Sequence, residues 1–186
     1  MERELTRLAI ELELPPDGGP VWFYPGATTR GGHDGILLSV LDTDGTTRLC
    51  MVASAANDGT LYSGPIEMPD NVRFYANGLL MSYDEPDVCE DVGVWPVLDA
   101  RWTPSQDRIV FHDHNCAVAY GPQGCAWRTG RLVLDGLELE DISDEVVRFT
   151  GYTFTDMDIA VKSHRLTIDV LSGRVVEGAS IQSLEG

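Results

Sequence analysis

Turn-forming residue pairs interrupt this chain so often that little room remains for a long helix. Asp-Gly and Asn-Gly pairs favour hairpin turns because their backbones readily adopt positive φ angles. Beyond residue 14, no amphipathic pattern continues for the roughly twelve residues that a helix prediction would need. The sequence therefore predicts an all-β protein built from antiparallel hairpins. Three such pairs, together with one Ser-Gly pair, separate short apolar runs: Asp44-Gly45, Asn77-Gly78, Asp135-Gly136 and Ser172-Gly173.

The chain length predicts a single all-β domain over residues 1–186, with halves 1–93 and 94–186 as the alternative division. Two short matches at an offset of 66 residues are consistent with an internal repeat. Cys50-Met51-Val52-Ala53 matches Cys116-Ala117-Val118-Ala119, and Tyr62-Ser63-Gly64 lies over Arg128-Thr129-Gly130. With such a repeat, we expect two packed sheets, arranged as a sandwich or as a two-blade, propeller-like array.

The charge balance excludes several classes of partner. The chain has 13 Lys and Arg against 30 Asp and Glu, for a net charge of -17. Neutralising phosphates needs clustered Lys and Arg, so we expect neither nucleic-acid binding nor binding to an anionic membrane surface.

Other sequence features indicate a cytoplasmic protein. There is no apolar run of about 18 residues that could span a membrane, and the first residues do not resemble a signal peptide. None of the four cysteines forms a CxxC pair, so we expect reduced thiols. The oligomeric state does not follow from the sequence.

Two acidic runs concentrate the negative charge, and neither contains a basic residue. Such runs speed association with basic partners and repel anionic ones. They are the candidate binding surface, although solvated loops and the wet face of a strand would also carry acids. The candidate residues are Asp84, Glu85, Asp87, Glu90 and Asp91 in the first run, and Asp135, Glu138, Glu140, Asp141, Asp144 and Glu145 in the second.

The segment His112-Asp113-His114-Asn115-Cys116 is the densest set of side chains that could bind a metal ion. On one continuous strand, His112, His114 and Cys116 would point to the same face, as two imidazoles and a thiolate suited to zinc. The alternative is a hairpin turn, because the polar residues 113–115 stand between two apolar runs. A turn would scatter the three side chains, and the sequence favours it, with no cofactor.

The last third of the chain resembles a group of uncharacterised bacterial β-rich proteins. The similarity lies in the segment from Trp127 to Leu137, with the pattern Trp-x-Thr-x-Arg-Leu-x-x-Asp-Gly-Leu, and in a later turn, Asp169–Arg174. The resemblance implies an all-β fold and a bacterial origin. It carries no activity and no site residues.

Three functions remain open at this point. The leading hypothesis is a non-catalytic acidic interaction protein, such as an inhibitor or immunity-type partner of a basic protein. The second is a metal-dependent or small-molecule-binding enzyme that uses the segment 112–116. The third is that the acidic surface serves only as an adaptation to salt.

Overall fold

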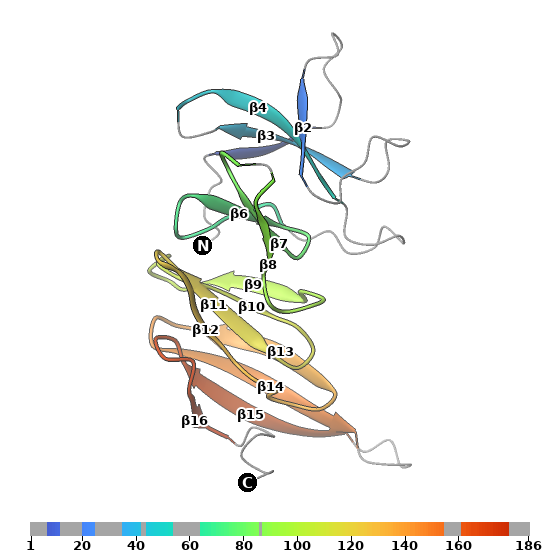
Figure 1. Cartoon of the computed structure of the whole chain (residues 1–186). Coiled ribbons are helices and arrows are strands. Elements are labelled where there is room, and N and C mark those ends of the chain that lie inside the picture. Colours follow the sequence, from blue (N-terminus) through green and yellow to red (C-terminus); the bar gives the residue numbers. More distant parts are fainter. Residues whose placement is uncertain are drawn as a thin grey trace. The chain divides into compact units, whose positions relative to one another are not determined.

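The computed structural model describes residues 7–11, 20–24, 35–41, 44–53, 64–85, 87–154 and 161–178. Within these residues every regular element is a β-strand, and sixteen strands form four sheets of four strands each (Figure 1). The predicted all-β class, with mostly antiparallel pairing, is confirmed. The same described residues include no helix with the length and apolar character required to span a membrane.

The chain divides into two compact units. The N-terminal unit consists of Glu4–Val92, and the C-terminal unit consists of Gly93–Gly186 together with Met1–Arg3. Each unit holds two of the four sheets, so the two packed sheets that the sequence indicated for the whole chain occur within each unit.

The first sheet of the N-terminal unit has the strand order β1-β3-β4-β2, and the second has the order β5-β6-β7-β8. Every neighbouring pair is antiparallel except β2 and β4, which are parallel. Asn77 and Gly78 have φ angles of 50° and 86° and form the predicted turn between β6 and β7. The strands are β1 (Leu8–Glu11), β2 (Val21–Phe23), β3 (Gly35–Leu41), β4 (Thr47–Ala53), β5 (Ile66–Glu67), β6 (Arg73–Ala76), β7 (Leu79–Ser82) and β8 (Cys89–Asp91).

Side chains from both sheets form the hydrophobic core of the N-terminal unit. Leu38, Val40 and Cys50 come from the first sheet, and Phe74 and Met81 come from the second; all are buried. The ring of Phe74 meets the ring of Tyr24 edge to face, with a centroid separation of 5.4 Å. This geometry is favourable for aromatic pairs and adds to the burial of apolar surface.

Both sheets of the C-terminal unit are meanders, with the orders β12-β11-β10-β9 and β13-β14-β15-β16. Sequential strands are joined by short connections, as the turn signals predicted. The strands are β9 (Asp99–Trp102), β10 (Ile109–His112), β11 (Ala117–Gly121), β12 (Gly124–Arg128), β13 (Gly136–Ile142), β14 (Val146–Phe154), β15 (Val161–Asp169) and β16 (Val175–Glu177).

Trp127 of β12 lies in the core of the C-terminal unit, together with Phe149 of β14 and Ile168 of β15. Its indole Nε1 donates a hydrogen bond to the carbonyl oxygen of Val170, 2.6 Å away. Gly173, with a φ of 69°, lies against the indole, and a Cβ at this position would be 2.7 Å from the ring. A glycine is required here because a side chain would meet both strain and a clash.

The two cysteines of the suggested repeat occupy different positions. Cys50 is fully buried within β4, whereas Cys116 lies in the connection between β10 and β11. The other matched segment begins with Tyr62-Ser63, which lies outside the described residues.

Candidate functional site

The second acidic run lies mostly on β13, an edge strand of its sheet. Leu137 and Leu139 of this strand are buried in the core, and they alternate with Glu138 and Glu140, which are exposed. This alternation follows from the two-residue period of a strand that has one buried face. The strand therefore presents its carboxylates on the outer face of the sheet.

Neighbouring strands bring partners to these carboxylates. The hydroxyl of Tyr152 donates to Glu138 at 2.7 Å, and Arg148 of β14 donates to Asp141 at 2.7 Å. Glu140 accepts a hydrogen bond from Thr150 and lies 3.7 Å from Nε of Arg165. The hydrogen bond to Glu138 holds the phenol proton and raises the pKa of Tyr152.

Two residues of this run have structural contacts with the β9 side of the unit. Asp144 accepts a hydrogen bond from the backbone N–H of Ser105, at 2.8 Å, and so holds the turn between β9 and β10. The carbonyl of Glu140 accepts a hydrogen bond from Nη1 of Arg101 at 3.3 Å. The contacts join β13 and the connection after it to the region of β9, which is the edge strand of the other sheet.

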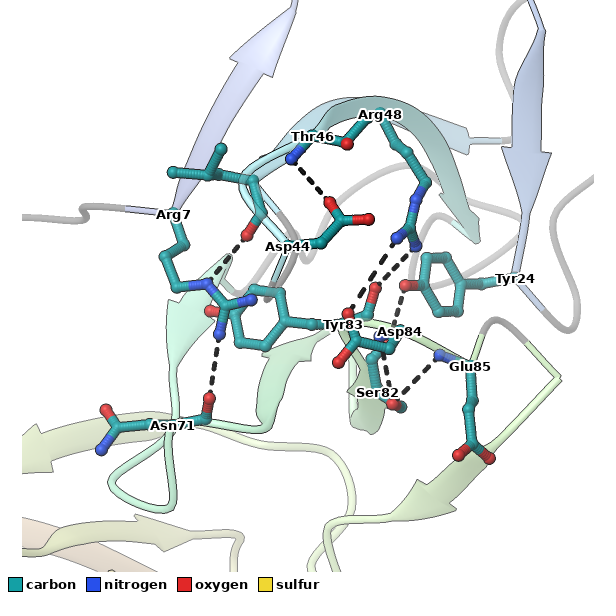
Figure 2. Close-up of polar contacts among 11 residues, drawn as sticks. Arg7, Tyr24, Asp44, Thr46, Arg48, Asn71, Ser82, Tyr83, Asp84 and Glu85 are labelled. Atoms are coloured by element: carbon teal, nitrogen blue, oxygen red, sulfur yellow. Dashed lines mark hydrogen bonds and ion pairs between the residues drawn. The ribbon is translucent and has the colours of Figure 1, made fainter.

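The first acidic run belongs to the N-terminal unit, where it forms the connection after β7 and the edge strand β8. The hydroxyl of Ser82 accepts hydrogen bonds from the backbone N–H groups of Asp84 and Glu85, at 3.3 and 3.2 Å (Figure 2). Glu90 pairs with Arg73 at 3.0 Å. All eleven candidate acids are exposed.

Sequence reasoning missed a pair of arginines that stack on aromatic rings in the N-terminal unit. Arg48 lies 3.8 Å above the ring of Trp22. It also donates to the carbonyl of Tyr83 at 3.0 Å and approaches Asp84 to 4.0 Å (Figure 2). Arg7 lies 3.7 Å above the ring of Tyr83. Single arginines separated by about forty residues carry no local signal that predicts such contacts.

Burial raises the pKa values of two groups near Arg48, the hydroxyl of Tyr24 and the thiol of Cys50. The hydroxyl of Tyr24 donates to the carbonyl of Ser82 at 2.6 Å, and burial raises the pKa of this tyrosine above its usual value. Burial also raises the pKa of the Cys50 thiol to about 11. Both groups are neutral near pH 7, so they contribute packing and hydrogen bonding rather than a reactive anion.

His112 ends β10, and residues 113–116 form the hairpin connection to β11, as the favoured alternative predicted. The Asp113 carboxylate accepts hydrogen bonds from the backbone N–H groups of Asn115 and Cys116, both at 2.7 Å, and fixes this turn. His112 is buried against the ring of Phe149, whereas His114 is exposed.

The turn therefore gives the metal-capable side chains different surroundings. His112 donates from Nδ1 to the carbonyl oxygen of Asp113 at 2.9 Å, and burial lowers its pKa. Burial also raises the pKa of Cys116. Within the described parts of the chain, no group of three or more His, Cys, Asp or Glu side chains is arranged to hold a metal ion.

Comparisons with protein-family models, with curated proteins and with solved structures found no match for this chain.

Proposed function

We propose that this chain is a non-catalytic acidic interaction protein that binds a basic protein, in the manner of an inhibitor or immunity-type partner. The observation that carries the proposal is the placement of both acidic runs. Each run includes a strand at the edge of a sheet, β8 or β13, and each keeps all of its carboxylates exposed. An exposed row of carboxylates attracts a basic surface over a distance of several ångströms and offers bidentate partners to arginine.

The arginines already present leave a surplus of negative charge on β13 and in the segment after it. Arg148 and Arg165 lie beside the acids of this run, against the three exposed carboxylates of Glu138, Glu140 and Asp141. Glu145 is exposed as well, and no described residue pairs with its carboxylate. The surplus supports an acidic contact surface for a partner that supplies Lys or Arg.

The opposite view is that the acids only protect the edge strands from pairing with other chains. Charged residues on edge strands have this effect in many β-proteins. The two views predict different effects of neutralising the carboxylates. If the acids bind a partner, the neutralised protein should lose that partner. If they only protect the edge strands, it should self-associate and keep any partner. Both outcomes can be measured on the same variants.

The test uses affinity capture from a lysate of the source cells with immobilised protein. The variant Glu138→Gln/Glu145→Gln neutralises the second run, and Glu85→Gln/Asp87→Asn neutralises the first. The matched control, Glu11→Gln/Glu177→Gln, removes two exposed charges outside both runs. We expect a basic protein that the wild type and the control retain, and that at least one run variant releases at lower salt. Equal retention by all four proteins would contradict the proposal.

A further inference from the structure

Among the described residues, the side chain of Arg108 lacks the acidic partner that other arginines of the C-terminal unit have. Arg101 binds the carboxylate of Asp99 at 2.8 Å, and Arg148 binds that of Asp141. The guanidinium of Arg108 makes no hydrogen bond or ion pair with any described residue, and its Nε is buried without a partner. Its backbone alone is engaged, with Thr103. A partly buried cation without a protein partner is unfavourable unless water or a ligand satisfies its donors.

The acid next to Arg108 in the sequence does not satisfy it. Asp107 accepts hydrogen bonds from the hydroxyls of Ser105 and Thr103, at 2.5 and 2.9 Å. The bond from Ser105 is the main reason that the pKa of Asp107 is lowered. The carboxylate is therefore held within its own turn, and it makes no hydrogen bond to the neighbouring guanidinium, which acts on it only through its charge.

Arg108 lines a hollow with a volume of about 490 Å³. A Cβ built on Gly121 would lie 3.5 Å from Nη1 of Arg108, so the arginine runs along the backbone of that glycine. Leu171 has 65% of its surface exposed and forms part of the wall. The other lining residues belong to the β11–β12 hairpin, residues 121–126.

We propose that this hollow binds a small organic carboxylate that carries an apolar group. A guanidinium forms strong, bidentate hydrogen bonds with a carboxylate, and partial burial strengthens them. Pro122, Ala126 and Leu171 offer an apolar surface to the remainder of the ligand, as small-molecule sites usually do. Arg108 is the single cation among the described residues that line the hollow, so the hollow suits a monoanion better than a multiply charged phosphate.

This binding site is independent of the proposed function. The acidic runs attract cations, whereas the hollow takes an anion in spite of the net charge of -17. Salt weakens the association of a basic partner with exposed acids. Salt also screens the long-range repulsion between this protein and a carboxylate, so carboxylate binding should not fall with salt in the same way. Failure of either proposal leaves the other one standing.

The experiment titrates the whole protein with sodium benzoate and follows backbone amide chemical shifts by NMR. We expect the largest shifts at residues 121–126, apart from Pro122, which has no amide proton. Replacing Arg108 by Gln removes the charged donor, and affinity should fall about ten- to hundred-fold. The variant Arg165→Gln removes an arginine that is 80% exposed on another sheet, and it should bind like the wild type.

A second variant and a second readout separate the hollow from a general charge effect. Ala126→Phe fills the hollow and leaves Arg108 in place, so it should weaken benzoate binding while far-UV circular dichroism stays unchanged. Cys125 is an exposed thiol in the lining, and bound benzoate should slow its alkylation by iodoacetamide. Acetate, which lacks the apolar group, should bind more weakly than benzoate.

Three results would overturn the inference. The first is that benzoate binds Arg108→Gln as tightly as the wild type, or causes no shifts at residues 121–126. The second is that Ala126→Phe leaves the affinity unchanged. The third is that inorganic phosphate displaces benzoate at lower concentration, which would assign the hollow to a different class of anion.

Discussion

The guanidinium carbon of Arg7 lies 3.7 Å from the ring centroid of Tyr83, and this contact joins the two sheets of the N-terminal unit. Arg7 precedes β1 in the first sheet, and Tyr83 follows β7 in the second. From the same side chain, Nε donates to the carbonyl of Leu41 and Nη1 donates to the carbonyl of Asn71, at 2.8 and 2.9 Å. One arginine therefore binds the backbone of β3 and of the connection between β5 and β6, as well as an aromatic face.

Replacing Arg7 by Met should destabilise the protein by about 1–3 kcal/mol, because it removes the cation–π contact and two charged hydrogen bonds. Urea unfolding followed by circular dichroism measures this change. Arg165→Met is the control, since an arginine that is 80% exposed should change stability by less than about 0.5 kcal/mol. Equal effects of the two substitutions would show that the contact between Arg7 and Tyr83 contributes nothing.

Trp127 provides a test of the core of the C-terminal unit. The substitution Trp127→Phe removes the hydrogen bond to Val170 and leaves part of the indole volume empty, so it should cost about 1–3 kcal/mol. Trp95, which is 58% exposed, is the matched control, and Trp95→Phe should leave the unfolding midpoint nearly unchanged. A destabilisation by Trp95→Phe as large as that by Trp127→Phe would contradict this description of the core.

The pH dependence of stability should report on His112. Burial disfavours the imidazolium, so the pKa of His112 in the folded protein lies below the value of about 6.5 for an unfolded histidine. As the pH falls through this value, the unfolded chain takes up the proton first, and stability is lost.

The variant His112→Gln should therefore lose less stability than the wild type between about pH 7 and pH 5. His114→Gln changes an exposed ring and should leave the wild-type dependence intact. Unfolding free energies measured across this range would contradict the account if both variants followed the wild-type curve.

The four cysteines should react in an order set by exposure and by pKa. Cys125 is exposed, whereas Cys50 is buried and has its pKa raised to about 11. Ellman's reagent at about pH 8 should label Cys125 first and reach Cys50 only after unfolding, because the thiolate is the reactive form. The variant Cys125→Ser should lose the fast phase. A fast phase that survives this substitution would show that the assignment is wrong.

Local signals predicted the class of fold. Asn77-Gly78 predicted a hairpin because these residues tolerate the positive φ angles that β6 and β7 require. The alternation of Leu and Glu in residues 137–140 is likewise a local pattern, and it identifies the buried and exposed faces of β13. These features depend on the period of a strand and on single turns, which a sequence shows directly.

Pairing between distant strands did not follow from the sequence. Nothing in the residues of Val21–Phe23 indicates a parallel partner in β4. The acidic run 135–145 contains no base, yet the register of β14 and β15 brings Arg148 and Arg165 beside it. The hollow at Arg108 was also missed, because it depends on a hairpin and on Leu171, which is far away in the sequence.

The most direct test of the proposed function is the salt dependence of partner capture by the wild type and by Glu138→Gln/Glu145→Gln. At an ionic strength of about 0.01 M, the wild type should retain a basic protein, and about 1 M salt should release it. The charge-neutralised variant should release the same protein at a lower salt concentration, and Glu11→Gln/Glu177→Gln should behave like the wild type. A wild-type sample that captures no basic protein released by salt would contradict the account.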